Sequence, residues 1–172
     1  MMNRISMAIV PLLILVVAMP AWTGCDRSSD TEQAEATAAP IGHAECAACG
    51  MTVGHQPAPR AQVVHSDGTR EYLCSISDLI HYATVPSPHG RITATFVEVM
   101  EADADPQELA TDERPWRAAE QTNYVIGVQR PRIMGPPVLT YEDAETAGAA
   151  AQAHEGTAVS WSELQTRLHE EG

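Results

Sequence analysis

The spacing of apolar side chains in the middle of the chain constrains its fold more than any other feature. A run that alternates apolar and polar residues is typical of a half-buried strand, and two shorter extended runs around the turn Ser-Asp-Gly-Thr predict a β-hairpin. A helix capped by Ser75 or Ser77 is expected directly after the hairpin. In chain order, the predicted elements are strands at 61–65 and 70–74, a helix over 75–83 and a strand at 91–100.

The second half of the chain repeats this plan after an acidic, loop-like segment. Ser160 and Glu163 have the spacing of a capping box at the start of the last helix. The predicted elements are strands at 123–128, 138–141 and 156–159, and helices over 142–154 and 160–169.

Two strand-strand-helix-strand halves predict an α+β fold of two small ββαβ-type units. We expect these units to span residues 43–115 and 116–172. Their similar plan suggests a small internal duplication, although no repeat is visible residue by residue.

The N-terminal residues have the pattern of an export signal. A short positive start, an apolar run at 9–18 and a small-residue exit predict a signal peptide over residues 1–24. The sequence Trp-Thr-Gly-Cys resembles a bacterial lipobox with Trp22 where leucine is usual, so Cys25 is expected to carry lipid and anchor the chain to a membrane. A plain signal peptide cut nearby is the alternative. The polar, Ala-rich residues 25–42 are predicted to be a disordered tether.

Charge limits the classes of partner. The chain has 23 acidic residues against 10 arginines and no lysine, a formal net charge of -13. This charge argues against nucleic acid as a partner, because its backbone is recognised mainly through basic surfaces.

The stretch His-Ala-Glu-Cys-Ala-Ala-Cys-Gly-Met at 43–51 is the candidate functional motif. Cys46 and Cys49 could form a structural disulfide, a redox pair, part of a zinc site or part of a site for Cu(I). A redox pair needs a helix to start at the motif, and the glycines and prolines that follow argue against one. Zinc needs further nitrogen or sulfur ligands, for which the nearby candidates are His43, His55 and His65.

Methionines favour the softer metal. Cu(I) accepts two to four thiolate or thioether ligands, and Met51 follows the second cysteine by two residues. Met134 lies in a loop rich in proline and glycine, where a flexible apolar side chain has no evident packing role. Cys74, at the end of a predicted strand, is interpreted as a small buried hydrophobic residue.

Taken in order, the lipobox, the tether, CAACGM, YLCSISDL and NYVIG followed by IMG resemble the NosL family. The resemblance implies a Cu(I)-binding metallochaperone that faces the periplasm from the inner or the outer membrane. It would supply copper for the copper-sulfide cluster of nitrous oxide reductase, together with an ABC-type membrane transporter. Carried over onto this chain, the metal ligands are Cys46, Cys49, Met51 and Met134.

The resemblance also implies a fold similar to the subunits of organomercurial lyase. No turnover is expected of a delivery protein, and an acidic partner for lyase chemistry is not identifiable from the sequence. A zinc-binding, thiol-redox or copper-homeostasis lipoprotein is the alternative function, with Zn(II) as the alternative metal. The His-rich C-terminal extension of some family members is not found in this sequence.

Overall fold

A computed structural model of the chain describes residues 36–57, 59–108, 111–130 and 135–170. The predicted signal peptide and most of the predicted tether lie outside these residues. No helix within the described ranges is long and apolar enough to span a bilayer. The strands are β1 (Ala61–His65), β2 (Arg70–Leu73), β3 (Ile92–Glu98), β4 (Trp116–Ala118), β5 (Asn123–Ile126), β6 (Val138–Tyr141) and β7 (Thr157–Val159), and the helices are α1 (Ile76–Ala83), α2 (Ala144–Ala153), α3 (Trp161–Glu170) and the 3-10 turns η1 (Val53–His55) and η2 (Ala119–Gln121).

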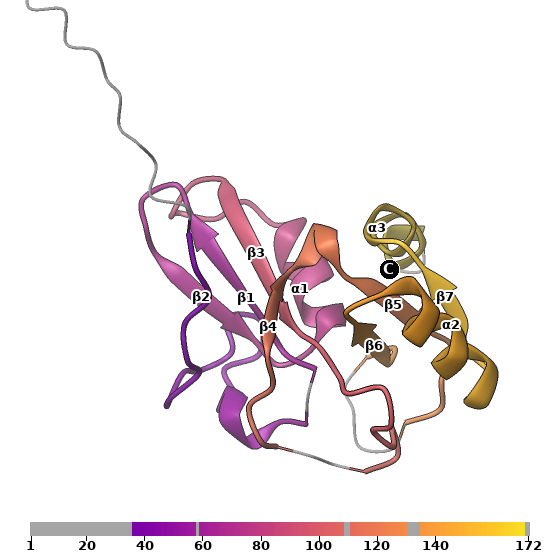
Figure 1. Ribbon diagram of the computed structural model, residues 1–172. Coiled ribbons are helices and arrows are strands. Elements are labelled where there is room, and N and C mark those ends of the chain that lie inside the picture. Colours follow the sequence, from indigo (N-terminus) through magenta and orange to yellow (C-terminus); the bar gives the residue numbers. More distant parts are fainter. Residues whose placement is uncertain (1–35, 58, 109–110, 131–134, 171–172) are drawn as a thin grey trace, which may run out of the picture. The chain divides into compact units, whose positions relative to one another are not determined.

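Two small antiparallel sheets form the fold (Figure 1). The first has the strand order β2-β1-β3-β4 and the second the order β6-β5-β7. The α+β prediction is therefore confirmed. Both predicted capping motifs also form: Ser75 accepts a hydrogen bond from the Asp78 N–H at the start of α1, and Ser160 and Glu163 make the reciprocal capping box of α3.

In each sheet, the strand that comes first in the chain lies between the next two: β1 lies between β2 and β3, and β5 lies between β6 and β7. This shared order agrees with two ββαβ-type units, while the duplication itself stays a prediction. The first sheet extends past the expected unit boundary at 115, because β4 begins at Trp116 and pairs with β3. The second sheet begins at Asn123.

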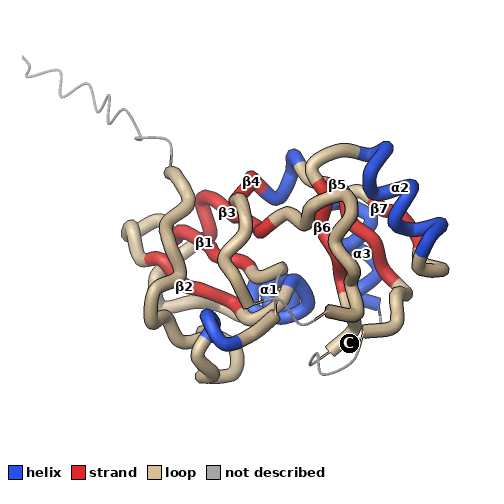
Figure 2. The backbone as a smooth tube through the Cα atoms, turned by 60° about the horizontal axis from the view of Figure 1, so that its bottom comes forward, coloured by secondary structure: helices blue, strands red, loops and turns tan. Residues whose placement is uncertain are grey.

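Helix α1 lies between the two sheets, and α2 covers the outer face of the second sheet (Figure 2). One hydrophobic core is shared by the two halves of the chain, so each half buries part of its apolar surface against the other. A second, smaller core holds α2 on its sheet through small alanine side chains. The shared core contains Val63, Leu73, Ile76, Leu79, Val97, Tyr124, Val138, Val159 and Leu164, and the smaller one contains Val125, Leu139, Tyr141, Ala147 and Ala150.

The ordered region begins before His43, which corrects the predicted end of the tether. Ile41 is buried in the shared core with 5% of its surface exposed. Two hydrogen bonds of 2.9 Å join the backbone of Ala39 to the side-chain amide of Gln62 on β1. The last residues before the CxxC motif are thus held against the first sheet.

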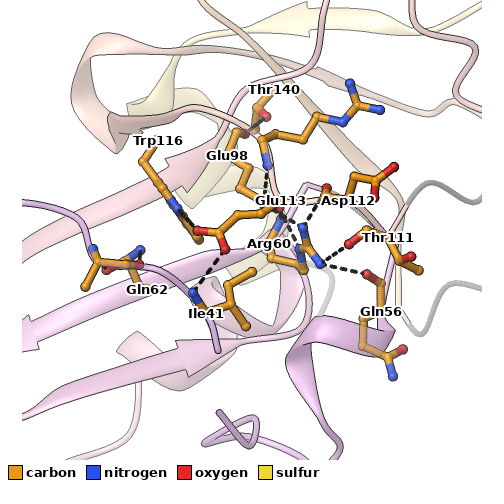
Figure 3. Close-up of polar contacts among 12 residues, drawn as sticks. Ile41, Gln56, Arg60, Gln62, Glu98, Thr111, Asp112, Glu113, Trp116 and Thr140 are labelled. Atoms are coloured by element: carbon orange, nitrogen blue, oxygen red, sulfur yellow. Dashed lines mark hydrogen bonds and ion pairs between the residues drawn. The ribbon is translucent and has the colours of Figure 1, made fainter. Parts of the chain in front are cut away.

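A buried ion pair joins the segment that enters β1 to the end of β3 (Figure 3). The guanidinium of Arg60 donates to both carboxylate oxygens of Glu98 at 2.7 Å, and neither residue is exposed to solvent. Further donors of Arg60 bind the carbonyls of Gln56, Thr111 and Asp112. Because every charge is matched by a directed partner, the pair fixes the geometry of this region.

Replacing Glu98 by glutamine is expected to lower the free energy of unfolding by about 3–5 kcal/mol, because it leaves the Arg60 charge buried without a counter-ion. Urea denaturation of the full chain measures this. The control is Glu142→Gln, which removes the half-exposed ion pair with Arg117 (2.8 Å) and should cost less than about 1 kcal/mol. Equal losses in the two variants would contradict the role given to the buried pair.

Candidate metal centre

The CxxC motif forms the tip of a narrow antiparallel loop. The N–H of Val53 donates to the carbonyl of Ala44 (2.9 Å), and the N–H of Cys46 donates to that of Met51 (2.8 Å). The tip is closed by Gly50, whose N–H donates to the Cys46 carbonyl (2.8 Å) with a φ of +74°. Only glycine adopts this conformation readily, which gives a physical reason for the glycine after the second cysteine.

This loop is attached to the edge of β2. Cys46 forms a parallel bridge with Tyr72, and the N–H of Ala47 donates to the Tyr72 carbonyl (2.9 Å). The N–H of Cys74 then donates to the sulfur of Cys46 (3.3 Å). Backbone pairing therefore brings a cysteine from 28 residues along the chain next to the motif.

Three thiols and one carboxylate converge at this point. The sulfurs of Cys49 and Cys74 are 3.6 Å apart, and one ligand atom from each of Cys46, Cys49, Cys74 and Asp78 lies within 4.8 Å of all the others. All three cysteines are free thiols. Cys46 and Cys74 are 3% and 6% exposed, whereas Cys49 faces solvent. We refer to these four residues as the thiol cluster.

The start of α1 positions the carboxylate. Ser75 caps the helix by accepting from the Asp78 N–H (3.0 Å), so Asp78 lies in the first turn, directly after the strand end that carries Cys74. The predicted ligand set contained neither Asp78 nor Cys74, which the structure places beside the CxxC motif. The sequence signal for them is their spacing. Cys74 ends a strand, the cap Ser75 follows at once, and the first helical turn then places Asp78, four residues after the cysteine, beside it.

Burial disfavours the charged forms of three groups in the thiol cluster. Desolvation raises the pKa of the Cys74 thiol far above its ordinary range and also raises that of Cys49, against a backbone hydrogen bond from Met51 that lowers it. Desolvation likewise raises the pKa of the Asp78 carboxyl, against the hydrogen bond with Ser75. A metal ion that binds here must therefore displace protons.

Of the two predicted methionine ligands, the structure describes only Met51. Met51 is half-buried and packs against the shared core, while its backbone carbonyl supports the loop. Met134 lies outside the described residues, as does the predicted lipidation site Cys25. Gly135, the residue after Met134, lies against Ser77 of α1, next to Asp78.

None of the three candidate histidines belongs to the thiol cluster. His65 is buried at the end of β1 away from the strand end that carries Cys74. Its Nδ1 donates to the Gly90 carbonyl and its Nε2 lies 3.0 Å from the Tyr82 hydroxyl, so both ring nitrogens are engaged. The other two are exposed, His43 and His55.

The donor set of the thiol cluster suits a thiophilic metal. Three sulfurs match the ligand preference of a soft ion, and three sulfurs with one carboxylate oxygen would also complete a tetrahedral zinc site. The CxxC motif itself lies in a turn and is followed in sequence by the three-residue η1, so it does not start a long helix as a thioredoxin-like pair does.

The chain was compared with known proteins. The NosL family model matches residues 38–169. The copper-binding lipoprotein NosL of Stutzerimonas stutzeri is 24% identical over 170 residues, which cover 99% of this chain and 87% of that protein. The crystal structure of the copper chaperone NosL from Shewanella denitrificans is similar in fold, with a TM-score of 0.59, 20% identity, and 75% of this chain and 94% of that one covered. The apo-NosL solution structure from Achromobacter cycloclastes gives a TM-score of 0.44 at 20% identity, with 59% and 82% covered.

The raised pKa of Cys74 can be tested on the metal-free chain by the ultraviolet absorbance of its thiolates. The difference between the wild type and Cys74→Ala should appear only above the ordinary thiol pKa of about 8.5. The pKa of Cys74 is higher in the folded chain than in the unfolded chain. Below the unfolded pKa this thiol leaves the free energy of unfolding unchanged, and above it the ionised thiol favours the unfolded chain and lowers that free energy. A difference that titrates at or below pH 8.5 would contradict the burial argument.

Proposed function

The chain belongs to the NosL family, and we propose that it binds Cu(I) as cargo at Cys46, Cys49 and Cys74 and delivers it for assembly of the copper-sulfide cluster of nitrous oxide reductase. One observation carries the binding step: three free thiols from two separate segments meet within 4.8 Å. The names of the relatives from Stutzerimonas and Shewanella support copper as the metal.

Ligand chemistry favours Cu(I) at these thiols. Cu(I) is soft and accepts thiolate ligands in low coordination numbers, so three sulfurs are sufficient for it. The backbone pairing of the Cys46 loop with β2 holds two of them in place before the metal arrives. Such preorganisation lowers the entropic cost of binding. Met51 and Met134 remain proposed as additional thioether ligands.

Unequal exposure of the thiols supports delivery as well as binding. Cys46 and Cys74 hold the ion from the protein side, while Cys49 lies at the solvent-facing tip of the loop. A ligand of the receiving protein can approach from this side and replace Cys49 first. The ion then passes over without being released to water, which a closed site would not permit.

The location and partners belong to the same proposal. Cys25 would carry the lipid anchor, and the chain would face the periplasm from the inner or the outer membrane. The tether would let the folded region reach a membrane-embedded ABC-type transporter and the reductase. The name of the Stutzerimonas relative, a lipoprotein, supports the anchor.

Zinc binding is the second candidate, and Asp78 is the observation that favours it. The thiol cluster has a carboxylate as its fourth donor, and Zn(II) accepts carboxylate oxygen and usually takes four ligands, whereas Cu(I) is satisfied by fewer. Asp78 is also the acidic partner that lyase chemistry would need. We place it outside the copper ligand set and propose no enzymatic turnover.

Each of Cys46→Ser, Cys49→Ser and Cys74→Ser is expected to weaken Cu(I) binding by at least about 100-fold, because even indirect partners of metal ligands contribute about 10–100-fold. Anaerobic competition with a Cu(I) chelator of known affinity measures this. The controls, His43→Ala and His55→Ala, should stay within about threefold of the wild type. Undiminished affinity in Cys74→Ser would overturn the three-thiol assignment.

Asp78→Asn separates the two metals. We expect it to leave Cu(I) affinity nearly unchanged and to weaken Zn(II) binding by at least about tenfold, because the amide supplies no charge to the divalent ion. Parallel titrations with the two ions test this. A large loss for Cu(I), or release of hydrocarbon from an arylmercury compound by the wild type, would contradict the proposal.

A further inference from the structure

The thiols of Cys49 and Cys74 are in contact although 25 residues separate them along the chain. Their sulfurs are 3.6 Å apart and both thiols are free. A disulfide bond is about 2.05 Å long, so the sulfurs would have to approach by about 1.5 Å. Cys49 lies in an exposed turn at the loop tip.

We propose that Cys49 and Cys74 form a reversible disulfide that closes the thiol cluster to metal. The formation of the bond follows from the geometry of the two thiols alone. Its consequence for copper loading rests on the proposed function.

Cys46 is the less suitable partner, although it belongs to the CxxC motif. Its side chain is buried, and its sulfur accepts the N–H of Cys74 at 3.3 Å. Its backbone is bound on both sides, through its N–H to Met51 and through its carbonyl to Gly50. An oxidant from solvent therefore reaches Cys49 first, and the sulfur in contact with Cys49 is that of Cys74.

The chemistry needs a disulfide-bearing oxidant, such as oxidised glutathione. The Cys49 thiolate attacks one sulfur of that disulfide, which forms a mixed disulfide and releases one glutathione thiolate. The Cys74 sulfur then attacks the Cys49 sulfur and displaces the second glutathione, which takes up the Cys74 proton. In total, two cysteine thiols are oxidised by two electrons and one glutathione disulfide is reduced to two thiols.

The bond would remove two of the three sulfurs that bind the ion. The copper-loaded and oxidised states of the thiol cluster therefore exclude each other. Bound copper would protect the thiols, and a reductant would restore the capacity to bind. The chain would then accept copper only after its two thiols have been reduced.

Disulfide mapping of the metal-free full chain tests this after incubation with oxidised glutathione. Because the chain has no lysine, trypsin cleaves only after arginine, which places Cys46 and Cys49 in peptide 28–60 and Cys74 in peptide 71–91. We expect these two peptides to be linked, with the link retained in Cys46→Ser and lost in Cys49→Ser. Fragmentation of the linked wild-type peptides between Cys46 and Cys49 locates the bond without any variant.

Several outcomes would overturn the proposal. A bond within peptide 28–60, a link made through Cys25 in peptide 5–27, or a lasting glutathione adduct on Cys49 would each show that Cys74 does not resolve the oxidation. In a second arm, one equivalent of Cu(I) added first should suppress the link at least tenfold. If the link forms in the metal-free chain but copper gives no protection, the failure lies in the copper site and not in the disulfide.

Discussion

The buried ion pair between Arg60 and Glu98 fixes the region on which the metal centre is built. Arg60 immediately precedes β1, and Glu98 is the last residue of β3, so their two short hydrogen bonds set these central strands against each other. β1 in turn positions β2, whose edge carries the CxxC loop. The same pair reaches the second sheet, because Thr140 of β6 donates to the Glu98 carbonyl. A charge buried this deeply is tolerated only when it is paired and hydrogen-bonded, and the Arg60–Glu98 contacts meet that requirement.

Beside this sheet, the thiol cluster combines buried and exposed cysteines. Cys46 and Cys74 are held by backbone hydrogen bonds and are buried. Cys49 lies at the tip of the loop and faces solvent. Fixed ligands favour capture of the ion and an accessible ligand favours its transfer. The same accessibility exposes Cys49 to oxidants, and under the two proposals above it would link delivery of the ion to the redox state of its surroundings.

Local features of the fold could be predicted from the sequence. The hairpin turn, the Ser75 cap and the capping box of Ser160 and Glu163 each depend on residues at most a few positions apart, and all three form. The short strand β4 was not predicted, because three residues beside an acidic loop have no periodicity of their own. Ile41 was assigned to the tether, because the surface that buries it comes from distant parts of the chain.

The candidate site shows the same limit. The spacing of Cys46 and Cys49 identifies the motif, whereas the position of Cys74 at a strand end predicts a packing residue and Asp78 belongs to no predicted ligand set. Their contribution depends on a pairing between β2 and a loop more than twenty residues earlier, which no local pattern encodes. The three candidate histidines are close to the motif in sequence, but none of them belongs to the thiol cluster. Nearness in sequence therefore did not predict nearness in the fold.

X-ray absorption at the copper edge tests the central claim most directly, because it counts the atoms bound to the ion. For the Cu(I)-loaded wild type, we predict a first shell made only of sulfur, with one sulfur fewer in Cys74→Ser. A nitrogen ligand in the wild type, or the same number of sulfurs in Cys74→Ser, would contradict the assignment of the three cysteines as the copper site.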